Sequence, residues 1–445
     1  MPNPYLPLWE YIPDGEPRVF GDRVYVYGSH DQAASDAFCD HKLLCWSASV
    51  DDLNHWTCHG HIFHTADDTD HRSDTSAWTD GYLFAPDVVE KDGKFYLYAY
   101  IMGAHGCVAV SDRPEGPFKL IDQYRHGEPT TPHEVGYGDG WFVDPGVLVD
   151  DDGRVYVYCG FERSFGVELD ADTMVDTKDD TFVEDILPPG QKPEDFYEAC
   201  SPRKIGDTYY LIYSPRRGSR LMYATADKPL GPYTIRGTIV DNGINYPAGN
   251  NHGSICKIKD QWYIFYHRMT NNTIMSRRGC VEKIEILPDG TIPEVEMTSL
   301  GFQESLNPYE ITPAEFACYL TGGCFVTEND AFTRSVVNIT HGCVLGYKYF
   351  NFGEDFASRT MQLQVRTGGR GIYSKIHVHI DTPDGPEIGV LDIGLADGVY
   401  TADVAAVTGR HALFFTAEST AGGWFPEMFA GRELFTMKEF TFRKM

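Results

Sequence analysis

The sequence predicts an all-β protein, with a five-bladed β-propeller followed by a β-sandwich of the jelly-roll kind. Three observations lead to this prediction. A short strand-like phrase returns five times in the first two thirds of the chain, helical periodicity is absent throughout, and the phrase does not recur in the last third. A length of 445 residues also favours two domains over one.

Each copy of the phrase is an Asp or Gly turn followed by alternating aromatic and aliphatic residues. This pattern is typical of the second strand of a β-hairpin. By subtraction the copies lie about 71, 60, 54 and 53 residues apart, and they begin at Gly21, Asp92, Asp152, Gly206 and Lys259. Such spacing accommodates four short strands, so each copy predicts one propeller blade.

An acidic residue or a histidine precedes every copy, at the expected start of the innermost strand of the blade. These residues are Asp14, Asp87, Asp144, Glu198 and His252. One such residue alone would most often be a turn former, but innermost strands line the central channel, so five matching positions predict a ring of side chains. Because carboxylates held close together resist ionising, the ring is expected to be a functional site.

Paired carboxylates of unequal pKa can catalyse the hydrolysis of glycosidic bonds. One carboxyl donates a proton to the leaving oxygen while the other, ionised, activates a water molecule or forms a covalent intermediate. Opposite walls of a propeller channel offer the wider separation that inverting enzymes need. Glu198 is the expected proton donor, because Glu has the longer side chain and the higher intrinsic pKa.

The repeat ends with the fifth blade, and Glu304–Pro308 has the composition of a linker. Beyond it lie short strand-like runs, among them residues 342–350, 361–365, 375–380, 412–416 and 435–442. Several strands without a helical period predict a β-sandwich. The expected domains are therefore a propeller over residues 1–303 and a sandwich over 304–445.

The composition excludes several kinds of partner. Asp and Glu number 65 against 37 Lys and Arg, a net charge of −28, so we expect neither nucleic acid nor a membrane surface to bind. Eleven scattered cysteines without a C-x-x-C pair predict reduced thiols, neither a disulfide framework nor a zinc site. The opening residues lack the pattern of a signal peptide, so a cytoplasmic location is expected. No oligomeric state is predicted.

Motifs from every predicted blade, in this order, resemble glycoside hydrolase family 43. They are Asp14 with the run GEPRVFGDRVYVYGSHD, Phe84-Ala-Pro-Asp87, Val143-Asp-Pro145, Tyr197-Glu-Ala199, His252-Gly-Ser254 and Ser276-Arg-Arg-Gly-Cys280. The resemblance implies a five-bladed propeller of inverting enzymes, mostly β-D-xylosidases, α-L-arabinofuranosidases and arabinanases. It also implies catalytic roles for Asp14 as general base, Glu198 as general acid and Asp144 as the residue that orients the acid and tunes its pKa.

The same resemblance implies contacts to substrate and metal. Arg277 matches an arginine that contacts the sugar in the −1 subsite, and Phe84, Asp87 and His30 belong to the matching motifs and are expected to bind substrate. His252 matches a channel histidine that, in some members, neighbours a calcium ion through water. No cofactor is expected for the chemistry itself, although a structural calcium in the channel is compatible with the resemblance.

Two positions depart from the family pattern. Phe84 stands where a Trp is usual, and Val143 stands where an aromatic residue is frequent, so the sugar preference is open. The C-terminal part resembles family-6 carbohydrate-binding modules more loosely. Trp424, in the run Gly422-Gly-Trp-Phe, is a candidate for stacking on a sugar, although packing against a neighbouring loop is the more common role.

The sequence therefore predicts an inverting exo-glycosidase that removes terminal α-L-arabinofuranose or β-D-xylose from short oligosaccharides such as those of arabinoxylan. Two alternatives are a retaining fructan hydrolase of similar architecture and a sugar-binding propeller without catalysis. The first would need an Asn-Asp-Pro-Asn-like start, which Pro13-Asp14-Gly15 does not provide. The second predicts loss of Asp14, Asp144 or Glu198, yet all three are present.

Overall fold

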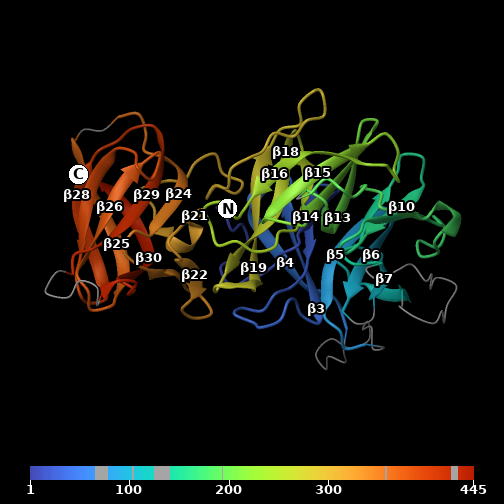
Figure 1. The fold of residues 1–445 in the computed structure, drawn as a ribbon, viewed down its shortest axis with the longest axis horizontal. Helices are drawn as coiled ribbons and strands as arrows, with labels where there is room; N and C mark the ends of the chain where they lie inside the picture. Colours follow the sequence, from blue (N-terminus) through green and yellow to red (C-terminus); the bar gives the residue numbers. More distant parts are fainter. Residues whose placement is uncertain (66–78, 103–104, 125–140, 193, 356–357, 422–428) are drawn as a thin grey trace.

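The computed structural model describes residues 1–65, 79–102, 105–124, 141–192, 194–355, 358–421 and 429–445 (Figure 1). These residues form two groups of β-sheets, which lie side by side in Figure 1. The described helices are two 3-10 turns, η1 (Asp179–Thr181) and η2 (Ala314–Phe316). None of the helices in the described ranges is long and apolar enough to span a membrane.

Five antiparallel sheets make up the first group, each with its strands in sequence order. Four sheets have four strands and the fifth has three, which confirms the predicted five blades. The first two blades consist of β1 (Glu16–Phe20), β2 (Arg23–Gly28), β3 (Lys42–Ser49) and β4 (Asp52–His64), and of β5 (Leu83–Lys91), β6 (Lys94–Ile101), β7 (His105–Ser111) and β8 (Lys119–Tyr124).

The third blade is formed by β9 (Gly146–Val149), β10 (Val155–Cys159), β11 (Phe165–Leu169) and β12 (Val183–Glu184). The remaining two comprise β13 (Phe196–Ile205), β14 (Thr208–Pro215), β15 (Arg220–Ala226) and β16 (Thr234–Asp241), then β17 (Ser254–Ile258), β18 (Gln261–Thr270) and β19 (Thr273–Ile284). The repeated phrase forms the second strand of every blade. A parallel bridge between Gly15 and Gly253 joins the first blade to the fifth and so closes the ring.

The second group is a sandwich of two antiparallel sheets. One has the order β22 (Phe325–Glu328), β23 (Arg334–Ile339), β30 (Phe435–Lys444), β25 (Thr360–Gly369) and β28 (Gly398–Ala405), with β20 (Thr312–Pro313) also paired to β30. The other has the order β21 (Tyr319–Leu320), β24 (Val344–Asn351), β29 (Arg410–Ser419), β26 (Ser374–Ile380) and β27 (Glu387–Ile393). This confirms the predicted sandwich, whereas a boundary after residue 303 stays a prediction.

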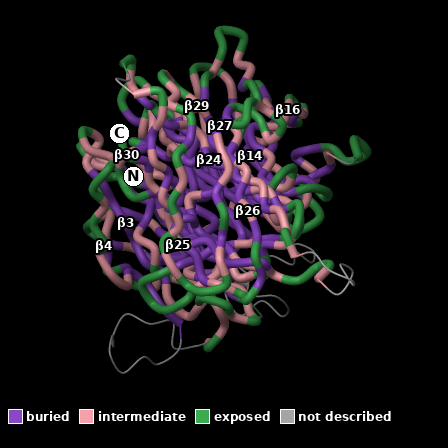
Figure 2. Tube along the Cα trace, turned by 90° about the vertical axis from the view of Figure 1, so that its left-hand side faces the viewer, coloured by how far each residue is buried: buried purple, intermediate pink, exposed green. Residues whose placement is uncertain are grey.

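Alternating side chains build the sandwich core. In β26 every second residue is buried, as expected for a strand with one face toward a core. Between the sheets, the Phe440 ring lies 4.8 Å from that of Tyr347 and 4.9 Å from that of Phe415. Figure 2 shows the buried residues along the strand interiors and the exposed ones concentrated in the connections.

The propeller and the sandwich share one continuous apolar cluster, which contains Tyr210 and Ile264 of the propeller as well as Ile339 and Phe440 of the sandwich. A buried ion pair also joins the two parts. The Arg278 guanidinium, at the propeller end of this pair, meets the Glu315 carboxylate of η2, and both side chains are only 1% exposed.

We expect Glu315→Gln to lower the free energy of unfolding by about 3–5 kcal/mol, because the buried guanidinium of Arg278 loses its counter-ion. The double variant Arg278→Met/Glu315→Leu, which removes both charges, should be less destabilised than the single variant. Denaturant titration followed by circular dichroism measures both. Glu439→Gln is the matched control, since it breaks a pair with Arg366 that is exposed to solvent; equal losses from the two Gln substitutions would contradict the prediction.

Candidate active site

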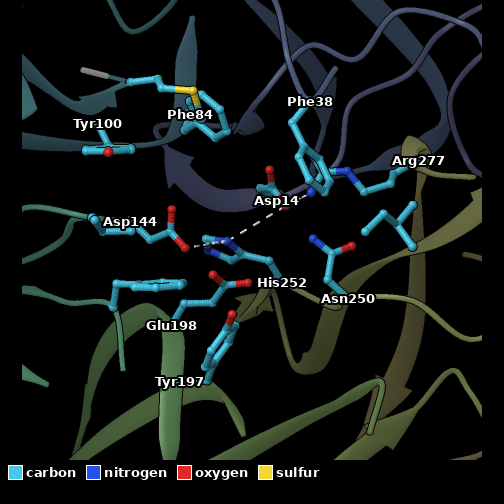
Figure 3. A pocket seen from close by; sticks show the side chains of 14 residues that line it. Asp14, Phe38, Phe84, Tyr100, Asp144, Tyr197, Glu198, Asn250, His252 and Arg277 are labelled. Atoms are coloured by element: carbon cyan, nitrogen blue, oxygen red, sulfur yellow. Dashed lines mark hydrogen bonds and ion pairs between the residues drawn. The ribbon is translucent and has the colours of Figure 1, made fainter. Parts of the chain in front are cut away.

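One pocket of about 520 Å³ opens at the end of the channel where the innermost strands begin. Its walls combine carboxylates, an arginine, a histidine and several aromatic rings (Figure 3). All five blades contribute to the lining, which consists of Asp14, Phe38, Phe84, Tyr100, Met102, Val143, Asp144, Phe161, Tyr197, Glu198, Asn250, His252, Ile274 and Arg277.

The backbone at the start of the innermost strands places the carboxylates at this end. Asp14 and Asp144 each lie two residues before a strand and have φ values of 54° and 51°. Asp tolerates this left-handed conformation better than most residues. Glu198 lies within β13 at two register shifts, next to Ala199 with φ of 68°. Three separate blades thus direct their carboxylates into one pocket.

The guanidinium of Arg277 occupies the centre of a buried charge cluster. It donates from Nε and Nη2 to the two oxygens of Asp31 at 2.8 and 2.9 Å, and from Nη1 to Asp14 Oδ1 at 2.8 Å. The Phe38 ring lies 5.0 Å from the guanidinium carbon. Since a planar guanidinium can hold two carboxylates at once, Arg277 fixes Asp14 in place.

Asp14 has the environment of an ionised carboxylate. Burial opposes its ionisation, but the charge of Arg277 and a hydrogen bond from Ser29 Oγ, at 2.7 Å, keep the pKa of Asp14 below its usual value. Ser29 Oγ is itself held by the backbone N–H of Ala85 at 2.8 Å. Asp14 is therefore suited to accept a proton.

Glu198 has the opposite environment. Burial, followed by the negative charge of Asp14, raises the pKa of Glu198 to about 7. Asp144 is buried next to it, and burial together with the charges of Glu198 and Asp14 raises the pKa of Asp144 as well. Asp144 accepts a hydrogen bond from the backbone N–H of Ala199, at 3.2 Å. The pocket thus combines an ionised carboxylate with a carboxyl that retains its proton near neutral pH.

Two histidines face this carboxylate cluster. Nδ1 of His252 lies 3.6 Å from Asp144 Oδ2 and 3.8 Å from Asp14 Oδ1, and links the two carboxylates (Figure 3). His267 is fully buried beneath Asp14, and burial, then the charge of Arg277, lowers its pKa to about 3. Neutral His267 can accept from the N–H of Asp14 at 3.4 Å while it donates to the Asn250 carbonyl at 3.1 Å.

Six of the eight residues singled out from the sequence line the pocket, and Asp87 and His30 do not. Asp87 is only 1% exposed and accepts two hydrogen bonds from Arg18, at 3.0 and 2.6 Å, deeper in the channel. It lies deeper because β5 begins earlier, so that Phe84 reaches the pocket instead. Of the five residues predicted to form a ring, four line the pocket: Asp14, Asp144, Glu198 and His252. The fifth, Asp87, forms a separate ion pair with Arg18.

His30 points to a pair of carboxylates outside the pocket lining. Its ring nitrogens lie 3.3 Å from Glu10 Oε1 and 3.5 Å from Asp40 Oδ2. Burial alone would lower the pKa of His30, but the neighbouring carboxylates of Asp40 and Glu10 raise it to about 9. His30 is therefore a cation that anchors the connection between β2 and β3.

The structure adds residues that sequence reasoning did not single out. Tyr197 and Asp31 directly adjoin predicted residues, so their motifs carried a usable signal. Phe38 and Phe161 lie in connections between strands, where nothing in the repeat marks them. Trp424 falls outside the described residues.

The described residues do not form a ligand set for calcium. Among them, no group of three or more His, Cys, Asp or Glu side chains is arranged to hold a metal ion. Calcium takes roughly six to eight oxygen ligands, whereas the carboxylates near His252 are engaged by Arg277, Ser29 and Ala199. A water-mediated calcium beside His252 stays a prediction.

This chain is similar to several known enzymes. It is 35% identical to a "Xylosidase/arabinosidase" of Thermoclostridium stercorarium, across 93% of this chain and 95% of that relative. A β-xylosidase/α-arabinofuranosidase from a compost metagenome, solved with xylotriose in a calcium-free form, is 27% identical, with a TM-score of 0.53 over 66% of this chain and 98% of that one.

A further solved structure shares the fold of the whole chain. It is an arabinoxylan arabinofuranohydrolase of Bacillus subtilis in complex with cellotetraose, 23% identical, with a TM-score of 0.56 over 100% of this chain and 97% of that one. The model of "Glycosyl hydrolases family 43" matches residues 10–292, which include all five blades. The chain therefore belongs to glycoside hydrolase family 43.

Proposed function

We propose that the protein is an inverting exo-glycosidase that removes terminal α-L-arabinofuranose or β-D-xylose from short oligosaccharides of the arabinoxylan type. The observation that carries this proposal is the unequal environment of two carboxyls that line one pocket: Arg277 and Ser29 donate hydrogen bonds to Asp14 and lower its pKa, whereas burial raises the pKa of Glu198 to about 7. The relatives named for xylosidase and arabinosidase activity support the choice of pentoses.

In this mechanism the ionised Asp14 accepts a proton from a water molecule that attacks the anomeric carbon. Glu198 donates its proton to the glycosidic oxygen, so the remainder of the oligosaccharide leaves as a neutral alcohol. Asp14 belongs to the first blade and Glu198 to the fourth, and their carboxyl groups face a common space (Figure 3). Such an arrangement suits attack and departure on opposite faces of the sugar.

Asp144 and Arg277 act on the two catalytic carboxyls in different ways. Asp144 accepts a hydrogen bond from the N–H of Ala199, which places its carboxyl beside Glu198, and the charge of Glu198 raises the pKa of Asp144. Arg277 favours the ionised form of Asp14 and lies where it can contact the bound sugar. Phe84 and Val143 line the pocket wall with side chains smaller than the family's usual aromatics and so leave more room for the sugar, and His252 lies between Asp14 and Asp144.

We also propose that the protein acts in the cytoplasm on oligosaccharides taken up by the cell. All eleven cysteines are free thiols, ten of them buried. Eleven reduced thiols are typical of a reducing compartment. Fractionation of the native organism, with detection by antibody, tests this location directly.

Glu198→Ala should lower kcat by about 100-fold or more on an oligosaccharide in which the released pentose is bound to xylose, because an alcohol leaving group needs the general acid. On p-nitrophenyl α-L-arabinofuranoside and β-D-xyloside, whose phenolate leaves readily, the loss should be smaller. Galactofuranoside and fructofuranoside derivatives complete the panel. Glu184→Ala, at an exposed position outside the pocket, is the control and should retain the wild-type rate. Full activity of Glu198→Ala would rule out this residue as the proton donor.

The first sugar released from an oligosaccharide should have the inverted anomeric configuration. In inversion, water attacks directly while the leaving group departs from the other face, so no covalent intermediate forms. Proton NMR during the first minutes of hydrolysis, before mutarotation, measures the anomer. Release with retained configuration would instead favour the fructan-type mechanism.

The pH profile of kcat/KM should fall on the alkaline side near pH 7, where Glu198 loses its proton. On the acidic side kcat/KM should stay high down to a pH below the usual pKa of Asp, because Arg277 and Ser29 favour the ionised form of Asp14. Ser29→Ala removes a hydrogen bond to the ionised form, raises the pKa of Asp14 and so moves the acidic limb to higher pH. A profile of Ser29→Ala identical to that of the wild type would contradict the role of Asp14.

A further inference from the structure

The rim of the pocket carries exposed apolar side chains from three blades. Phe161 is 40% exposed, Ile274 41% and Met102 54%, and all three line the pocket. Exposed apolar side chains gathered at a cavity mouth are typical of ligand-binding surfaces. Phe161 is the one with an aromatic face.

Phe161 lies on a short turn that is fixed at both ends. Before it, the N–H of Gly160 donates to the Val143 carbonyl at 2.8 Å; after it, the N–H of Glu162 donates to the Tyr197 carbonyl at 2.7 Å. Val143 precedes Asp144 and Tyr197 precedes Glu198. The turn is therefore held against the backbone next to Asp144 and Glu198.

The conformation of this turn leaves Phe161 little freedom to move. Gly160 has φ of 144°, and a Cβ there would lie 1.9 Å from the Arg163 carbonyl oxygen, so only glycine fits. Arg216 donates to the Glu162 carbonyl at 2.7 Å. The Phe161 ring also packs on the Tyr197 ring, with centroids 4.9 Å apart at an angle of 56°.

The place of this ring follows from the chemistry of the proton donor. Glu198 protonates the oxygen that joins the released sugar to the rest of the substrate, so the first unit of that remainder lies next to Glu198 on the solvent side. Phe161, next to Glu198 through Tyr197 and open to solvent, lies on that side. An aromatic face can cover the C–H face of a pyranose ring, which is apolar although its edge is polar.

We propose that Phe161, supported by Tyr197, is the platform for a xylopyranose unit on the leaving-group side of the cleaved bond. The proposal rests on the glycosidase function proposed above and specifies its substrate, in which the released pentose is attached to a xylopyranose unit and not to a small alcohol. Xylopyranose suits the site because it has no exocyclic hydroxymethyl group and presents flat C–H faces to the ring.

The test compares substrates with and without a sugar on the leaving-group side. One substrate is an oligosaccharide in which the released pentose is bound to xylose; the other is the glycosyl fluoride of the same pentose, whose leaving group reaches no platform. In Phe161→Ala, the ratio of kcat/KM for the oligosaccharide to kcat/KM for the fluoride should fall about tenfold. Phe161→Tyr, which keeps the ring, should restore the ratio.

Phe332→Ala is the matched control, because Phe332 is 75% exposed but belongs to the sandwich. It should leave the ratio at the wild-type value. Equal losses on both substrates in Phe161→Ala would show that the ring only positions Glu198 through Tyr197, and would overturn the platform. An unchanged ratio with no loss on either substrate would overturn it too.

A binding measurement separates this proposal from the proposed activity. Calorimetric titration of xylotriose into Glu198→Gln, with and without Phe161→Ala, measures the platform without turnover, and we expect about tenfold weaker binding in the double variant. Equal affinities would overturn the platform even if the wild type cleaves pentosides. Weaker binding in the double variant would support it even if the wild type releases no pentose, a result that would contradict only the proposed function.

Discussion

The charge balance around Arg277 is the constraint on which the active-site end of the propeller depends. Asp14, Asp31, Asp144 and Glu198 are brought together at one end of the channel, where four negative charges would repel one another strongly. One buried guanidinium offsets two of them through three short hydrogen bonds. The remaining two carboxyls respond by raising their pKa values, so the same balance that permits folding also separates an ionised base from a protonated acid.

The sandwich takes part in holding this arrangement. The two-residue turn between β18 and β19, Asn271 and Asn272, has φ values of 55° and 52°, as a tight hairpin requires. Asn271 accepts hydrogen bonds from Thr327 Oγ1 at 2.9 Å and the Glu328 N–H at 3.1 Å, and donates to Ser276 Oγ at 2.8 Å. Because Arg277 follows Ser276, the sandwich supports the strand that carries the central cation of the pocket.

The departures from the expected ring have simple physical causes. A repeat in the sequence preserves the approximate position of a residue in its blade. A strand that begins early, or a bulge, changes how deep in the channel that residue lies. Asp87 lies deeper for this reason and neutralises Arg18. His30 lies beside two carboxylates of its own surroundings and becomes a structural cation. Neither effect leaves a mark in the local sequence, because the partners of Asp87 and His30 lie between ten and about seventy residues away.

The sequence by itself determined the five blades, the sandwich and most of the acidic residues at the pocket. Local rules suffice for these features, because turn residues and the alternation of side chains act within a few residues. The same local pattern then returns once in every blade. Tertiary structure alone decided the charge partners of Arg277, the depth of Asp87 and the places of Phe38 and Phe161 in the pocket wall. Tertiary structure also decides the pKa values of Asp14 and Glu198. Burial and Coulomb interactions depend on distances between blades, which no stretch of sequence encodes.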